Sequence, residues 1–331
     1  MPSVRATVII PTFNGRELLT EALAHLTRQT VAHDVVVVDN GSTDGTAEEL
    51  AERFPEVQVV RRDANTGFGR AVNAGVAAAR TDAVVLINND VLCEADFLER
   101  LLEPLADESV SMVAGILLQH DRPQLVDSAG IELDTTLRSW DSFWNRPESE
   151  IAGDAEPVGP CGGAAAFRTA VFREVGGFDE TFFAYWEDVD LALRLQLAGH
   201  RCIRANGARA LHKHGQTLGA ASPAQRRLEA FGRAYVLARY RVARRSPIMR
   251  LKIAVLDWPV LLVHLVVRRE VGPLRERRRG TRAGLARPAL RAPLELATVS
   301  FASAFGRQLG LLRLRAGGSL PSHFDQSAPR A

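Results

Sequence analysis

The chain has 331 residues and a formal net charge of +2 at pH 7, with 46% hydrophobic and 24% charged residues. This composition is typical of a folded globular protein and excludes an intrinsically disordered one. The length exceeds that of a typical single domain and suits a large α/β domain with a helical appendage. Acidic residues dominate much of the front of the chain and arginines the back, so we expect the back to face an anionic partner.

The cysteine content and the N-terminal sequence indicate where the protein works. Cys93, Cys161 and Cys202 are too few and too widely spaced for a disulfide framework, which indicates a reducing compartment. The apolar run that begins at Val8 is stopped at Pro11, before it reaches the length of a secretory signal. We therefore expect a cytoplasmic protein.

Four short apolar runs in the first third of the chain alternate with helical patterns. The runs are nearly continuous, as expected of strands covered on both faces, and apolar residues recur at three- and four-residue spacing between them. The predicted strands are 7–10, 35–38, 57–60 and 83–87, and the predicted helices are 16–27, 46–53, 69–80 and 95–105. This βαβαβαβ order predicts a doubly wound, mostly parallel α/β sheet flanked by helices.

Polar segments follow three of these strands, at residues 11–15, 39–45 and 88–90. In a doubly wound sheet such segments gather at the carboxyl edge of the strands, where ligands bind. Segment 39–45 is rich in Asp, Asn, Ser and Gly, so it is equally a good turn and helix-capping sequence. The residues alone leave both interpretations open.

The next part of the chain is less regular and ends in an acidic cluster. We expect a loop or a small antiparallel region over 119–160, followed by the glycine-rich segment 161–166. Glu187, Asp188 and Asp190 then stand directly before a helical stripe that stops at Gly199. A carboxylate there can take a proton from an attacking hydroxyl, although carboxylates in a first turn also stabilise a helix.

The last hundred residues differ from the rest in composition. Residues 253–267 are apolar, but the run is short and is interrupted by Asp257, Pro259 and His264, so we do not expect it to span a membrane. Arginines flank this run and the later segment 301–314. We expect a helical extension over 221–315 that lies on an anionic lipid surface, or a helical bundle with solvated arginines, and a loose tail over 316–331.

Several motifs, taken together, resemble glycosyltransferase family 2, and most closely its bacterial rhamnosyltransferase-like branch. They are Val37 to Thr46, Asn65-Thr66-Gly67-Phe68-Gly69 with Asn73-Ala74-Gly75, Asn88-Asn89-Asp90, and Gly176 to Asp179 before Trp186 to Leu191. Their order and spacing fit the family from about residue 4 to about residue 240. The arginine-rich end lies outside the resemblance.

The resemblance implies a GT-A fold over residues 1–220, with a nucleotide-sugar half over about 1–118 and an acceptor half over about 119–220. It implies an inverting transfer from a dTDP-, UDP- or GDP-linked sugar, with dTDP-rhamnose as the first expectation, and a divalent cation, Mg²⁺ or Mn²⁺. A glycan or polyprenyl-linked acceptor in cell-envelope polysaccharide synthesis would suit an enzyme peripheral on the inner face of a bacterial membrane. No nucleic acid partner is expected.

The resemblance also assigns roles to individual residues. Asp188 is the expected base, with Glu187 in support and Asp190 in a structural role, although the sequence does not exclude Asp190 as the base. The family metal motif is commonly Asp-X-Asp, so Asp90 is the retained ligand here, and His212 is its expected partner. The acceptor loop is expected at Gly162, Gly163 and Trp186. The donor-binding residues are expected to be Thr12, Asn14, Asp39, Asn40, Ser42, Asn65, Gly67, Phe68, Asn73, Asn88 and Asn89.

Two other classes of function compete with a glycosyltransferase. A nucleotidyltransferase also uses an α/β sheet and acidic metal ligands, but neither a GxxxxGK[ST] nor a GxGxxG segment occurs in the early position. A protein that only binds membranes or nucleic acid through its arginines would have no need of an intact acidic cluster.

The expected metal ligand His212 also has an alternative interpretation, because a histidine in this context, taken alone, is typical of a surface residue.

Overall fold

The computed structural model describes residues 4–151, 153, 156–213 and 222–315. The predicted tail over 316–331 lies outside these residues. The chain divides into two compact units. The first contains residues 1–131, 141–144 and 148–220, and the second contains 132–140, 145–147 and 221–331. Segments 132–140 and 145–147 thus come from within the range predicted as the first domain.

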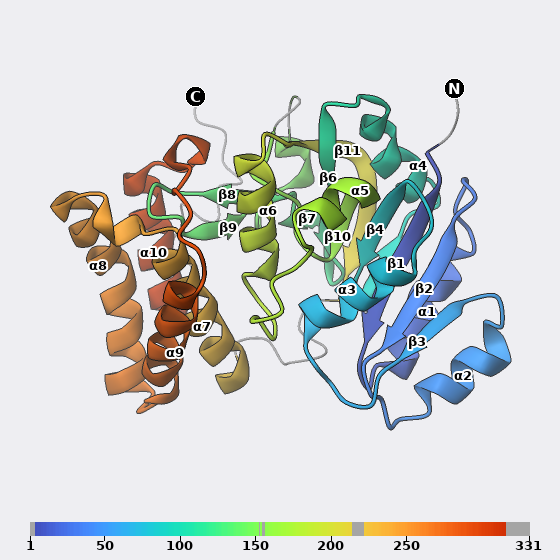
Figure 1. Cartoon of the computed structure of the whole chain (residues 1–331), viewed down its shortest axis with the longest axis horizontal. Helices are drawn as coiled ribbons and strands as arrows, with labels where there is room; N and C mark the ends of the chain where they lie inside the picture. The colour runs from blue at the N-terminus through green and yellow to red at the C-terminus, as the bar shows by residue number, and fades with distance from the viewer. Residues whose placement is uncertain (1–3, 152, 154–155, 214–221, 316–331) are drawn as a thin grey trace. The chain divides into compact units, whose positions relative to one another are not determined.

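The first unit is built on a mixed sheet of nine strands among the described residues (Figure 1). The strands run in the order β3-β2-β1-β4-β10-β6-β11-β5, with β7 paired to β6. The first four strands of that order are parallel, and β10 enters antiparallel between β4 and β6. The strands are β1 (Ala6–Thr12), β2 (Asp34–Asp39), β3 (Gln58–Arg61), β4 (Ala83–Ile87), β5 (Val91–Cys93), β6 (Val110–Gln119), β7 (Arg122–Ser128), β10 (Ala164–Arg168) and β11 (Arg201–His212).

Helices cover both faces of this sheet, because side chains along each strand point alternately to opposite faces. Val8 and Ile10 pack in one apolar cluster with α1, α2 and α4, whereas Ile9 packs in the other with α3, α5 and α6. The helices are α1 (Arg16–Leu26), α2 (Thr46–Arg53), α3 (Phe68–Ala78), α4 (Phe97–Leu102), α5 (Thr169–Glu174) and α6 (Glu187–Leu197), with short 3₁₀ turns η1 (Glu103–Ala106) and η2 (Glu148–Glu150). The predicted α/β fold class is confirmed.

Residues 119–160, where we expect a loop or a small antiparallel region, contain both loops and short antiparallel strands. Strand β7 pairs antiparallel with β6, and a separate pair is formed by β8 (Ile131–Leu133) and β9 (Ser139–Asp141). The turn between β8 and β9 belongs to the second unit.

The second unit is mostly helical. Its elements are α7 (Pro223–Arg239), η3 (Val242–Arg244), α8 (Pro247–Leu262), the π-helical turn η4 (Val263–Val267), α9 (Gly272–Ala286), η5 (Leu294–Leu296) and α10 (Phe301–Arg315). Helices α7 and α9 approach closely because Gly280 and Gly284 have no side chain: a Cβ there would lie 2.2 and 2.4 Å from backbone oxygens of α7. Among the described residues, no helix has the length and hydropathy to cross a membrane.

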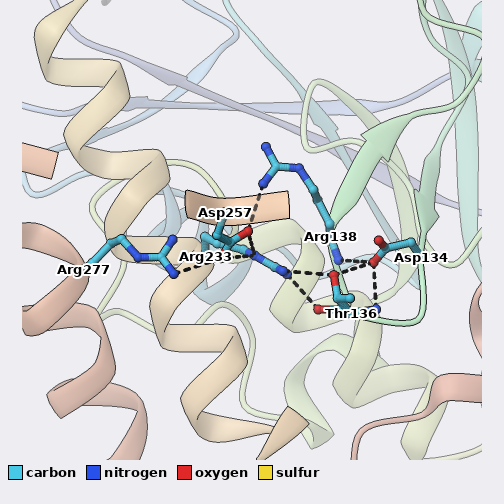
Figure 2. Close-up of polar contacts among 6 residues, drawn as sticks. All are labelled: Asp134, Thr136, Arg138, Arg233, Asp257 and Arg277. Carbon is cyan, nitrogen blue, oxygen red and sulfur yellow. Dashed lines mark hydrogen bonds and ion pairs between the residues drawn. The ribbon is translucent and has the colours of Figure 1, made fainter. Parts of the chain in front are cut away.

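A buried ionic cluster fixes segment 132–140 to the helices of the second unit (Figure 2). The carboxylate of Asp257 accepts hydrogen bonds from Arg138 at 3.4 Å, Arg233 at 3.3 Å and Arg277 at 2.8 Å. Arg233 also donates to the backbone oxygen of Thr136 at 2.8 Å. Burial raises the pKa of Asp257, but the three guanidinium charges outweigh that effect and lower it to about 2. Asp257 is therefore ionised and fully engaged.

Candidate active site

Hydrogen bonds tie together the segments that follow β1, β2 and β4. Thr12 Oγ1 accepts from the Asn89 side chain at 3.0 Å. The backbone N–H of Asn14 donates to Ser42 Oγ at 2.9 Å, and that of Ser42 donates to Asp39 Oδ1 at 2.8 Å. The structure thus brings five of the predicted donor-binding residues to one edge of the sheet.

Asp39 carries a buried oxygen that the protein does not satisfy. Its side chain is fully buried, and Oδ2 accepts no hydrogen bond from any described residue. Arg61 lies nearby, with Nε at 3.7 Å from Oδ2. A buried acceptor without a donor is costly, so this oxygen fits an N–H group brought by a ligand.

The side chain of Asn40 organises the next predicted segment. It donates to Asn65 Oδ1 at 3.0 Å and accepts from the backbone N–H of Thr66 at 3.2 Å. Gly67 follows with φ +92°, and a Cβ there would lie 2.3 Å from the backbone oxygen of Phe183. The segment therefore depends on a glycine both for its backbone conformation and for its contact with the chain before α6.

Phe68 and Asn73 connect α3 to the segment that leads into α6. The N–H of Phe68 donates to the Phe183 oxygen at 2.7 Å, and its ring lies 5.8 Å from the ring of Phe178. Asn73 donates to the backbone oxygen of Phe178 at 2.9 Å and accepts from its N–H at 3.0 Å. In this structure Asn73 anchors the Phe178 turn to α3.

Two consecutive glycines, Gly162 and Gly163, connect the acidic cluster at the start of α6 to the segment that follows β4. The N–H of Gly162 donates to Asp188 Oδ2 at 3.3 Å, while the oxygen of Gly163 accepts from the Asn88 N–H at 3.4 Å. A Cβ at Gly163 would lie 3.1 Å from the Asn88 side chain. The predicted acceptor loop therefore brings Asp188 and Asn88 to the same place.

The acidic cluster opens α6 after a strained turn. Tyr185 and Trp186 both have positive φ, +66° and +77°, a conformation that costs side-chain-bearing residues free energy and that clusters at functional sites. Asp188 Oδ1 accepts from the Val189 N–H at 2.8 Å. Burial raises the pKa of Asp188, and these backbone hydrogen bonds only partly oppose the shift.

Glu187 and Asp190 differ sharply in their surroundings. Burial, and then the charge of Asp188, raise the pKa of Glu187 to about 8, and its Oε2 has no hydrogen-bond partner among the described residues. Asp190 instead receives a 2.8 Å hydrogen bond from Arg194, which also donates to the backbone oxygens of Val175 and Gly177. Asp190 thus positions Arg194, which holds the turn after α5 against α6.

The predicted metal ligands lie side by side, and a third residue orients one of them. His212 Nε2 is 3.3 Å from Asp90 Oδ1, and His212 Nδ1 is 2.6 Å from Asp127 Oδ2. Burial alone would lower the pKa of His212, but the hydrogen bonds and charges of the two carboxylates raise it to about 10. Asp127 was not predicted, since it stands within strand β7 in no recognisable motif.

These residues fit a cation that takes part of its coordination from a ligand. Nowhere in the described ranges do three His, Cys, Asp or Glu side chains converge to hold a metal by themselves. One carboxylate and one imidazole are sufficient when diphosphate oxygens and water fill the remaining positions of a hard cation. A carboxylate on the far nitrogen of a ligating histidine is a usual supporting contact. Burial, and then the charges of Asp141, Asp188 and Asp127, raise the pKa of Cys161, so this thiol lies near the acidic cluster and near Asp127.

The fold is that of the GT-A glycosyltransferases. The mannosyltransferase PcManGT from Pyrobaculum calidifontis, solved with GDP-Man and Mn²⁺, superposes with a TM-score of 0.55 at 21% identity, over 95% of this chain and 82% of that one. GalNAc-T7, solved with UDP, GalNAc and Mn²⁺, superposes with a TM-score of 0.60 at 13% identity, over 78% of this chain and 51% of that one.

The sequence profile of glycosyl transferase family 2 matches residues 7–176, more than half of the chain. The protein therefore belongs to glycosyltransferase family 2. A second profile, the N-terminal domain of galactosyltransferase, matches residues 156–215, which include the acidic cluster and His212.

Curated relatives place the chain in the rhamnosyltransferase-like branch. The N-acetylglucosaminyl-diphospho-decaprenol L-rhamnosyltransferase of Mycobacterium tuberculosis is 29% identical over 237 residues, which cover 64% of this chain and 77% of the relative. The O-antigen chain rhamnosyltransferase RfbN of Salmonella typhimurium is 27% identical over 225 residues, which cover 65% and 68%. Both the predicted family and its predicted branch are confirmed.

Proposed function

We propose that this glycosyltransferase is metal-dependent and inverting, and that it moves L-rhamnose from dTDP-rhamnose to a hydroxyl of a lipid-linked glycan in cell-envelope synthesis. The observation that carries the proposal is the bridge of Gly162 and Gly163, which brings the Asp188 carboxylate next to the segment of Asn88 and Asp90. A proton acceptor and a site for a leaving diphosphate are the two parts that such a transfer needs.

Asp188 is the base in this proposal. Its raised pKa makes it a stronger proton acceptor than an exposed aspartate. The acceptor hydroxyl gives its proton to Asp188 as its oxygen bonds to the anomeric carbon. The bond from that carbon to the phosphate oxygen breaks, and its electron pair leaves with the nucleoside diphosphate. A single displacement of this kind inverts the anomeric configuration.

Asp90 and His212 are the proposed ligands of a Mg²⁺ or Mn²⁺ ion, with Asp127 fixing the ring of His212. When bound, a divalent cation offsets the negative charge of the departing diphosphate. Two structural neighbours were solved with Mn²⁺, which supports a cation here without choosing between the two metals.

The donor nucleoside is proposed to lie against the ends of β1 and β2. The unpaired Oδ2 of Asp39 suits the ring N–H of thymine, uracil or guanine and does not choose among them. Rhamnose from dTDP-rhamnose remains the first candidate because the two relatives described above are rhamnosyltransferases. The other residues expected at the donor site are likewise proposed to bind the nucleotide sugar.

The acceptor is proposed to be lipid-linked and the enzyme to work at the inner face of the membrane. The mycobacterial relative is named for a decaprenol-linked sugar, and α8 and α9 of the second unit expose large apolar side chains next to arginines. This combination is typical of proteins that rest on an anionic membrane surface.

A panel of nucleotide sugars, incubated with the protein and Mn²⁺ or Mg²⁺, tests the proposal by release of nucleoside diphosphate. We expect dTDP from dTDP-rhamnose in excess over UDP or GDP from the other donors. Release of pyrophosphate would indicate a nucleotidyltransferase, and binding without any release would indicate a non-catalytic protein. Either result contradicts the proposal.

A further inference from the structure

The second unit contains a groove between α8 and α9 that the proposed transfer does not use. Its volume is about 640 Å³, within the range of pockets that hold small ligands. Residues of one face of each helix line it: Arg250, Ile253, Asp257 and Leu261 follow one another at three- and four-residue spacing on α8. Leu274, Arg278 and Leu285 line the facing side from α9.

The groove combines an apolar interior with a cationic opening. Leu261 is buried and Ile253 half-buried, whereas Arg250, Arg278 and Arg282 are exposed at the surface. Among the described residues, Asp257 is the one acid that lines the groove. Its charge is already countered by Arg138, Arg233 and Arg277 (Figure 2). The groove therefore carries a net positive charge.

An exposed apolar stripe runs along α8 beside this groove. Leu251, Trp258, Leu262 and Val266 share one side of the helix and its π-turn, and they are exposed by 64%, 57%, 52% and 70%. Soluble surfaces rarely carry such a contiguous apolar patch without a partner. Trp258 belongs to both the stripe and the groove lining, and tryptophan is favoured at the boundary between lipid and water.

We propose that the groove between α8 and α9 binds the phosphate headgroup of an anionic membrane lipid, while the stripe beside it rests in the outer part of the bilayer. Guanidinium groups suit phosphate because they donate paired hydrogen bonds, and the apolar interior suits the glycerol and the start of the chains. A second copy of this chain would bring an equally positive groove to the contact, and the two would repel each other. The charge of the groove therefore favours an anionic lipid as its occupant. This inference deepens the membrane association proposed above and is independent of the donor.

Flotation of the full-length protein with vesicles tests the proposal. One set contains phosphatidylcholine alone, and the other an equal mixture of phosphatidylcholine and phosphatidylglycerol. The wild type is expected to float with the mixed vesicles, and the double variant Arg278→Gln/Arg282→Gln to bind them at least about tenfold more weakly. The matched control Arg275→Gln/Arg279→Gln removes the same charge from α9 outside the groove lining and should lose about threefold or less.

A second readout reports contact with the lipid itself. Brominated phosphatidylglycerol should quench part of the tryptophan fluorescence of the wild type, and this part should be missing in Trp258→Phe. Circular dichroism of each variant verifies that it folds.

Equal losses of vesicle binding in the two double variants would be consistent with general surface attraction but would overturn the groove as the lipid site. The groove and the membrane association would both be overturned if the wild type bound neither kind of vesicle. The same holds if light scattering showed that it forms a dimer through the stripe. Donor turnover, measured without vesicles, is untouched by either result, so the transferase proposal is judged separately.

Discussion

The carboxylate of Asp127 accepts a 2.6 Å hydrogen bond from Nδ1 of His212. This contact points Nε2 toward Asp90, so the imidazole faces the proposed cation with its other nitrogen. Asp127 comes from β7 and His212 from the end of β11. Since β6 pairs with both strands, the sheet itself brings the two residues together.

Asp127→Asn should weaken cation binding. A carboxylate behind a ligating histidine typically contributes about 10- to 100-fold to metal affinity, so the Mn²⁺ concentration for half-maximal donor hydrolysis should rise by about that factor. Asp121→Asn is the control, because the side chain of Asp121 is 97% exposed. An unchanged Mn²⁺ requirement in Asp127→Asn would separate Asp127 from the metal site.

Glu187→Gln should alter how stability depends on pH. The pKa of Glu187 is raised from 4.5 to about 8 in the folded protein, so the folded state keeps a proton that the unfolded chain releases above pH 4.5. The wild type therefore loses stability from this group as pH rises from 4.5 to 8.

Thermal unfolding of both proteins across this range measures the effect. The Tm of Glu187→Gln minus that of the wild type should grow from pH 5 to pH 8. A difference that stays constant with pH would contradict the raised pKa.

Gly67→Ala should destabilise the protein more than Gly176→Ala. Both glycines have positive φ, +92° and +82°, but a Cβ at Gly67 would meet the backbone of Phe183 whereas nothing lies within 4 Å of one at Gly176. Gly176→Ala should cost about 1–2 kcal/mol from backbone conformation, and Gly67→Ala about 1–3 kcal/mol more from overpacking. Thermal melts of the two variants compare them directly, and equal melting temperatures would remove the Phe183 contact as the cause.

Asp257→Asn should destabilise the second unit by about 3–5 kcal/mol, because it leaves buried arginine charge unpaired. The pKa of Asp257 falls from 3.8 to about 2 in the folded state. Its contribution is therefore present above pH 4 and lost as the pH falls from 4 to 2. Denaturation at pH 7 and at pH 2 should show a large difference between variant and wild type at pH 7 and a smaller one at pH 2.

The control is Glu276→Gln, which breaks the exposed pair of Glu276 with Arg279 and should cost less than about 1 kcal/mol. Similar losses in the two variants would contradict a structural role for the Asp257 cluster.

The parts of the fold that could be predicted are those that local pattern encodes. Strands β1, β2 and β4 and helices α1 to α3 follow continuous or periodic apolar runs, and the predicted ranges differ from the observed ones by a few residues. The helix predicted over 95–105 begins at Phe97 and changes to a 3₁₀ turn at Glu103, where Pro104 removes a backbone donor.

The contacts that depend on distant residues could not be predicted. Asp127 acquires its role only when β7 and β11 both pair with β6. The turn between β8 and β9 meets the helices of the second unit through contacts such as those of Arg138 with Asp257 and of Arg233 with Thr136. The inequality of Glu187, Asp188 and Asp190 was expected from the family resemblance. The physical basis of this difference is visible only in the structure. Glu187 is buried, and Asp190 is paired with Arg194.

Transfer by Asp188→Asn, measured together with donor affinity, tests the central claim most directly. The variant keeps the shape of the side chain but cannot accept the proton, so turnover should fall by about 10²- to 10⁴-fold while the Kd for the nucleotide sugar stays that of the wild type. Asp121→Asn should turn over normally. Turnover by Asp188→Asn close to that of the wild type would show that another group takes the proton.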